Sequence, residues 1–135
     1  VDFNKNVVNA LNGYFDFVNN KKITITSNDF KKFFSEKQYF KNDFVYLDPP
    51  YLITASEYNK FWDSKSESDL LNLIDNLDKR GVKFALSNVT HYNGSKNDLL
   101  IEWMGQYKVH KIESNYISYH NNGKKIIKEV LITNY

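Results

Sequence analysis

The chain of 135 residues contains no cysteine, only two prolines and a single arginine, Arg80. The absence of cysteine excludes a disulfide framework and a metal site built on thiolates. The histidines His91, His110 and His120 lack the spacing of metal ligands, so we expect no metal. A lone arginine also leaves few guanidinium groups for bidentate recognition of guanine.

Long apolar runs and a strong charge of one sign are missing as well. Because the sequence shows neither an apolar run of 18 residues nor a secretory signal, we expect a cytoplasmic chain without a membrane partner. The net charge of +2 is too small to establish nucleic-acid binding by itself. In contrast, 41% hydrophobic and 16% aromatic residues predict one folded domain with a core.

The two prolines stand together in the segment Asp48-Pro49-Pro50-Tyr51, directly after the apolar run 44–47. This run predicts a buried strand, and open α/β sheets bind ligands at the carboxyl ends of such strands. Asp48 and the carbonyl of Pro49 could accept hydrogen bonds from an amine on a planar base, while Tyr51 could stack on its ring. The segment therefore indicates a site for a planar amine. The alternative is a stiff turn with a solvated carboxylate.

The same segment is similar to the catalytic motif of the amino-methyltransferases, and residues 43–51 resemble the Dam-like, D12 class of adenine-N6 DNA methyltransferases. Three further segments are similar to this family in the same order, residues 25–30, 86–88 and 129–135. The resemblance implies S-adenosylmethionine as the cofactor and double-stranded DNA as the partner. It also implies that adenine is rotated out of the duplex and that Asp48 and the Pro49 carbonyl hold its N6 for methyl transfer.

The resemblance implies a role for three groups of residues. The catalytic residues would be Asp48, Pro49, Pro50 and Tyr51. The cofactor contacts would be Asp29, Phe30 and Asp48, although Asp29 could equally cap the helix that follows it. The substrate contacts expected are Tyr51 and Asn88, with two residues that the sequence itself suggests: Tyr58 in the irregular segment after Tyr51, and Lys124 in the lysine cluster at the predicted hairpin tip. For the lysines at 124, 125 and 128 the alternative is solvated surface, and for Asn88 it is a plain polar residue at a strand end.

The Gly-rich Phe-x-Gly-x-Gly loop of this family does not occur among the five glycines. Residues 1–135 therefore resemble a partial catalytic domain, the C-terminal part, without the first cofactor-binding strand and the target-recognition segment. We expect a gap in its sheet between the strands that end at Asp29 and Asp48. A missing N-terminal part, or another copy of the chain, would then be a further partner.

Hydrophobic periodicity predicts alternating helices and strands in the first half. The apolar residues between positions 3 and 18 share one face of a helix, and Ile23 and Ile25 alternate with threonines as in a strand. A short helix over 29–35 should then precede the strand over 44–47.

The second half predicts a βαβ unit and a hairpin. Ser66 should cap a helix, with Asp69 at the capping-box position and Gly81 at its left-handed end. The strand over 82–86 should pair in parallel with the strand over 44–47 and end at Ser87 and Asn88. A helical segment over 99–104 follows. Alternating stretches over 108–119 and 125–135, joined by a turn at Asn122-Gly123, should form an antiparallel pair.

The fold class expected is α/β, the C-terminal half of a Rossmann-like S-adenosylmethionine-dependent methyltransferase fold, with three αβα layers and a terminal antiparallel hairpin. The function expected from the resemblance is methyl transfer to N6 of adenine in DNA, in a setting such as restriction-modification. Two alternatives stay open. One is an amino-methyltransferase that acts on RNA or protein, and the other is a non-catalytic remnant or interaction module of the same fold.

Overall fold

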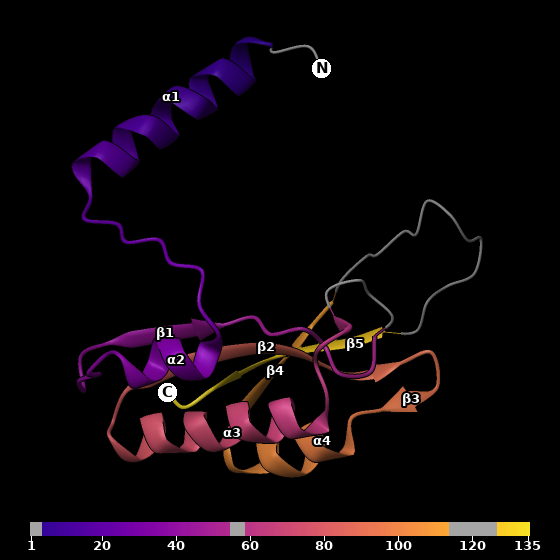
Figure 1. Ribbon diagram of the computed structural model, residues 1–135. Coiled ribbons are helices and arrows are strands. Elements are labelled where there is room, and N and C mark those ends of the chain that lie inside the picture. Colours follow the sequence, from indigo (N-terminus) through magenta and orange to yellow (C-terminus); the bar gives the residue numbers. More distant parts are fainter. Residues whose placement is uncertain (1–3, 55–58, 114–126) are drawn as a thin grey trace. The chain divides into compact units, whose positions relative to one another are not determined.

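The computed structural model describes residues 4–54, 59–113 and 127–135 (Figure 1). The chain divides into two compact units, which we call unit 1 (Val1–Glu36) and unit 2 (Lys37–Tyr135). Every buried residue among those described lies in unit 2. The hydrophobic core of the chain is therefore formed by unit 2.

Unit 1 contains two helices, α1 (Lys5–Asn20) and α2 (Phe30–Ser35). The side chain of Asn4 caps α1 by accepting a hydrogen bond from the amide of Val7 at 3.1 Å. Asp29 caps α2 by accepting from the amide of Lys31 at 2.9 Å. The two helices predicted over residues 3–18 and 29–35 are thereby confirmed.

The strand predicted around Ile23 and Ile25 is wrong, because residues 21–28 are neither helix nor strand. A β-strand is stable only when its backbone groups pair with a neighbouring strand. The described residues of unit 1 contain no other strand. Local alternation of apolar residues is therefore not enough to form a strand around Ile23 and Ile25.

Unit 2 is built on a mixed sheet in which the main strands follow the order β1-β2-β5-β4 (Figure 1). The strands are β1 (Phe44–Leu47), β2 (Lys83–Tyr92), β3 (Ser95–Lys96), β4 (Lys108–Ile112) and β5 (Ile127–Thr133). β1 and β2 are parallel, while β5 is antiparallel to both β2 and β4. These pairings confirm the predicted βαβ unit and the predicted antiparallel pair. The predicted turn at Asn122-Gly123 lies outside the described residues.

Helices α3 (Ser64–Lys79) and α4 (Asp98–Trp103), followed by the short 3-10 helix η2 (Met104–Gln106), cover one face of this sheet (Figure 1). The apolar side of α3 is buried against the sheet at Leu70, Ile74 and Leu77. None of the described helices combines the length and the apolar character that crossing a bilayer requires.

The start of α3 differs from the prediction, because Asp63 and not Ser66 is the N-cap. The Asp63 carboxylate accepts hydrogen bonds from the amide of Ser66 at 2.8 Å and from its hydroxyl at 2.7 Å. Aspartate caps helices as well as serine does, and the helix gains a further turn by starting earlier. Asp69 pairs with Lys65 at 3.1 Å instead of closing a capping box. The end of α3 is as predicted, with Gly81 at a φ of 74°.

The expected α/β class is confirmed, but β1 is less buried than predicted. Phe44 and Tyr46 are 55% and 59% exposed, and only Leu47 of this strand is buried. β1 lies at the edge of the sheet. The helices α3 and α4 cover one face of the sheet and leave its second face uncovered by the described residues of unit 2 (Figure 1). The described residues of unit 2 thus form two layers, and the third layer stays a prediction.

Candidate active site

The predicted catalytic segment lies at the carboxyl end of β1. The parallel register places Leu47 beside Leu86, so the chain next brings Asp48 alongside Ser87. The hydroxyl of Tyr51 donates to the carboxylate of Asp48 at 3.2 Å and lies 3.1 Å from the hydroxyl of Ser87. Because the phenol has one proton, Ser87 is the donor in the second hydrogen bond. The structure therefore brings together Asp48, Tyr51 and Ser87.

Burial, together with nearby negative charge, keeps the hydroxyl of Tyr51 protonated because both raise its pKa. Burial raises the pKa of Tyr51 to about 12; the hydrogen bond from Ser87 lowers it, and the negative charges of Asp48 and Glu129 raise it. At neutral pH the phenol is therefore a donor to Asp48. A carboxylate has two acceptor oxygens, so the exposed Asp48 retains capacity to accept from a ligand.

The backbone after the two prolines is fixed by a small set of hydrogen bonds. The carbonyl of Tyr51 accepts from the amide of Thr54 at 3.1 Å and from the side-chain amide of Asn59 at 2.6 Å. The hydroxyl of Thr54 donates to the same carbonyl at 3.1 Å. The contacts with Thr54 close a turn that directly follows Tyr51 in the chain. Nothing in the sequence pattern distinguishes Thr54 or Asn59 from other polar loop residues.

Asn88 is not brought to Asp48, and the strand does not end at this residue as predicted. β2 continues to Tyr92 because β5 pairs with it along this whole stretch. Asn88 is fully buried, and its side chain donates to Glu67 of α3 at 3.0 Å. Neighbouring residues of a strand point to opposite faces, so Ser87 and not Asn88 faces Tyr51. A role of Asn88 in substrate binding stays a prediction.

The other predicted contacts lie elsewhere in the chain. Asp29 and Phe30 belong to unit 1, which is described by itself, and Asp29 makes the capping hydrogen bond that was its alternative role. Tyr58 and Lys124 lie outside the described residues. Their roles in binding cofactor or substrate therefore stay predictions.

Glu67 is a residue that the sequence interpretation missed. It is fully buried although it is ionisable, and it accepts hydrogen bonds from three side chains. The sequence does contain a signal for its burial, because Glu67 shares one helical stripe with Leu70, Ile74 and Leu77. An acidic residue on the apolar stripe of a helix predicts a buried polar network.

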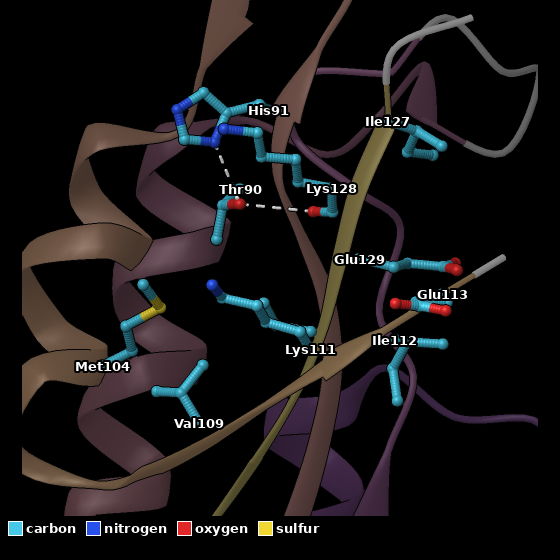
Figure 2. A pocket seen from close by; sticks show the side chains of 11 residues that line it. Thr90, His91, Met104, Val109, Lys111, Ile112, Glu113, Ile127, Lys128 and Glu129 are labelled. Carbon is cyan, nitrogen blue, oxygen red and sulfur yellow. Dashed lines mark hydrogen bonds between the residues drawn. The ribbon is translucent and has the colours of Figure 1, made fainter.

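A cavity of about 690 Å³ is lined by residues of β2, β4 and β5, by Met104 and by Glu113. Figure 2 shows Lys111 and Lys128 extending toward Thr90 and His91 along its wall. The hydroxyl of Thr90 donates to the carbonyl of Lys128 at 3.2 Å. Glu129 borders the same cavity and also raises the pKa of Tyr51. The cavity thus carries two lysines, and Glu129 is the lining residue whose charge acts on Tyr51.

Residues 2–117 match the family model described as D12 class N6 adenine-specific DNA methyltransferase. The chain is 40% identical to the type II methyltransferase M.FokI of Planomicrobium okeanokoites, over 90% of the chain and 20% of that protein. It is 42% identical to the modification methylase StsI of Streptococcus sanguinis, over 98% of the chain and 22% of that protein. It is 37% identical to the type II methyltransferase M1.LlaDCHI of Lactococcus lactis subsp. cremoris, over 89% of the chain and 42% of that protein. The chain therefore spans about a fifth of the first two relatives and less than half of the third.

Proposed function

Because the chain belongs to the D12 class N6 adenine-specific DNA methyltransferases, we propose that it forms the catalytic segment of an enzyme that methylates N6 of adenine in DNA. The observation that supports this proposal is the exposed carboxylate of Asp48 at the end of β1, next to the ring of Tyr51. StsI is named a modification methylase, so the setting we propose is a modification system.

The chemistry assigned to the site follows from the weakness of an aromatic amine as a nucleophile. The lone pair of N6 is delocalised into the adenine ring. Hydrogen bonds from the amine to Asp48 and to the Pro49 carbonyl draw the nitrogen toward tetrahedral geometry, and the lone pair then becomes available. Tyr51 stacks on the base, and its own hydrogen bonds to Asp48 and Ser87 hold the ring in place. Such fixed placement of the reacting group is a large part of enzymatic rate enhancement.

S-adenosylmethionine is the methyl donor that we propose, and it supplies an electrophilic methyl group on a sulfonium. When bound, the donor would supply this methyl group to N6, with the electrons of the sulfur–carbon bond staying on sulfur and the N6 proton passing to water. The residues that we assign to this donor are Asp29, Phe30 and Asp48. An exposed carboxylate fits such a role because it can accept from an exocyclic amine or from hydroxyl groups.

The DNA partner is supported by the two lysines of the cavity. Lys111 and Lys128 come from neighbouring strands and line the same cavity. Ammonium groups are common contacts for the phosphates of a DNA backbone, which position a duplex without reading its sequence. We therefore assign these two lysines to phosphates of the DNA backbone.

The experiment that tests the function measures transfer of labelled methyl groups from S-adenosylmethionine to duplex DNA, RNA and protein. The chain is placed in M1.LlaDCHI in exchange for the matching segment, either unchanged or with Asp48→Ala. We expect transfer to adenine in DNA by the unchanged segment and a loss of about 100-fold or more with Asp48→Ala. Saturable binding of S-adenosylmethionine should be weaker without the Asp48 contact but largely retained in the variant. Equal rates for the two proteins, or transfer only to RNA or protein, would contradict the proposal.

A further inference from the structure

Glu67 is a buried carboxylate that joins three separate segments of unit 2. Its Oε2 accepts a hydrogen bond from the indole of Trp62 at 2.7 Å. Its Oε1 accepts from the side-chain amides of Asn88 at 3.0 Å and Asn97 at 3.1 Å. A carboxylate without partners would be very costly at a site with no exposed surface. The network therefore holds these three segments together. One of its members, Trp62, comes from the segment that follows the catalytic residues in the chain.

A continuous path of contacts leads from this network to the catalytic segment. The indole of Trp62 is held by Glu67, and the backbone amide of Trp62 donates to the carbonyl of Asn59 at 3.0 Å. The side chain of Asn59 donates to the carbonyl of Tyr51 at 2.6 Å. Tyr51 in turn donates to Asp48. Every step of this path lies within the described residues.

We propose that Glu67 is a positioning residue for the catalytic segment. By holding the indole of Trp62, it fixes the turn that presents Asn59 to the carbonyl of Tyr51, and Tyr51 is thereby held against Asp48. Glu67 is buried and acts through these residues without touching a substrate. A displacement of about 1 Å at a reacting group is enough to slow catalysis strongly, which gives such support its value. The catalytic meaning of this role rests on the proposed function, whereas the mechanical link does not.

The chemistry of the network provides a substitution that breaks it without changing its size. Both oxygens of Glu67 are acceptors, and all of its partners are N–H donors. Glutamine has only one acceptor oxygen, and its amide is a donor. Glu67→Gln must therefore lose either the indole of Trp62 or the two asparagine amides. Trp62→Phe removes the same link from its other end.

The same helix contains a matched control for this carboxylate–indole pair. Asp75 lies about two turns further along α3, and it accepts from the indole of Trp103 at 2.8 Å and from the hydroxyl of Tyr107 at 2.9 Å. These partners belong to α4 and to the residue after η2. Asp75→Asn and Trp103→Phe thus disturb an equivalent hydrogen bond that does not join the path to Tyr51.

The test uses the 135-residue chain with carbon-13 in its tyrosine rings, and the Tyr51 signal is identified by its loss in Tyr51→Phe. We expect Glu67→Gln and Trp62→Phe each to move the Tyr51 signal by more than its linewidth. Asp75→Asn and Trp103→Phe should leave this signal in place, although they also lower the denaturation midpoint. Circular dichroism establishes that each variant is folded.

Two results would overturn the positioning role. The first is an unmoved Tyr51 signal in both folded variants of the Glu67–Trp62 pair. The second is loss of folding in both, because the network would then serve the fold as a whole. Neither result depends on methyl transfer or DNA. Failure of this inference is therefore distinguishable from failure of the proposed function, which is read from the Asp48→Ala comparison.

Discussion

At the scale of single residues, the ionisation of Tyr51 depends on the charge of Asp48. We expect Asp48→Asn to lower the pKa of Tyr51 from about 12, because burial remains but the negative charge that raises the pKa is removed. A titration of carbon-13-labelled tyrosine rings would measure this change. Tyr107, whose pKa is raised by burial and by Asp75, is the internal control and should not change. An unchanged Tyr51 pKa would contradict the short contact between Asp48 and Tyr51.

The raised pKa of Tyr51 also makes the stability of the folded chain depend on pH. The folded chain favours the protonated phenol, so the contribution of Tyr51 to stability is complete below its unfolded pKa near 10. It is lost as the pH rises through about 12. A chain with Tyr51→Phe should therefore show a smaller fall in denaturation midpoint over this range than the unchanged chain.

The grouping of Asp48 with Tyr51 was predictable because both residues lie in one short segment after an apolar strand. The participation of Ser87 in place of Asn88 was not. These two residues are adjacent, and which of them faces Tyr51 depends on the face of β2 that α3 covers. Glu67 could have been found from its place on the apolar stripe of α3. Its partners Asn88 and Asn97 come from distant parts of the chain, so no local pattern identifies them.

At the scale of elements, the first turn of α3 depends on its aspartate cap. Hydrogen bonds from the amide and hydroxyl of Ser66 lower the pKa of Asp63. We expect Asp63→Ala to lower the denaturation midpoint in urea, because the first turn loses its acceptor. The control is Asp69→Ala, whose surface pair with Lys65 should matter less.

The effect of the Asp63 cap should also depend on pH. A carboxylate with a lowered pKa contributes stability above its unfolded pKa of about 4 and loses it as the pH falls through the folded value. The difference between Asp63→Ala and the unchanged chain should thus shrink in acid. A difference that persists unchanged at the lowest pH would contradict the capping role.

The helices and most strands were predictable because their periodicity is local. The strand expected at Ile23 failed, because pairing is a property of two segments and unit 1 offers no described partner. β2 is longer than predicted for the related reason that β5 supports it as far as Tyr92. Sequence patterns thus predict which segments can form strands, while the arrangement of neighbours decides which of them do.

At the scale of the whole molecule, the position of the core makes a prediction about truncation. All buried residues among those described lie in unit 2. We expect residues 37–135 alone to unfold cooperatively, with a denaturation midpoint close to that of the full chain. Ile74→Ala in either version should cost about 2–5 kcal/mol, as expected for a fully buried isoleucine. Loss of cooperative unfolding in the shorter chain would contradict this prediction.

A second prediction at this scale concerns DNA binding by the two lysines of the cavity. Lys111→Ala combined with Lys128→Ala should weaken binding of duplex DNA irrespective of sequence. It should also reduce the slope of log affinity against log salt by about 2, one for each phosphate contact. Fluorescence anisotropy at several salt concentrations would measure both effects. Lys79→Ala with Lys83→Ala, at the end of α3 and the start of β2, is the matched control, and equal effects of the two pairs would point to net charge alone.

β1 has one described neighbour, so one row of its backbone amides and carbonyls faces outward. An exposed strand edge of this kind is a template onto which a strand of another molecule can add through main-chain hydrogen bonds, whatever its side chains are. The apolar residues Phe44 and Tyr46 increase this tendency because they too are exposed. The strand that carries the catalytic carboxylate is therefore also one of the two described edges of the sheet, together with β4, at which self-association into aggregates is expected in concentrated solution.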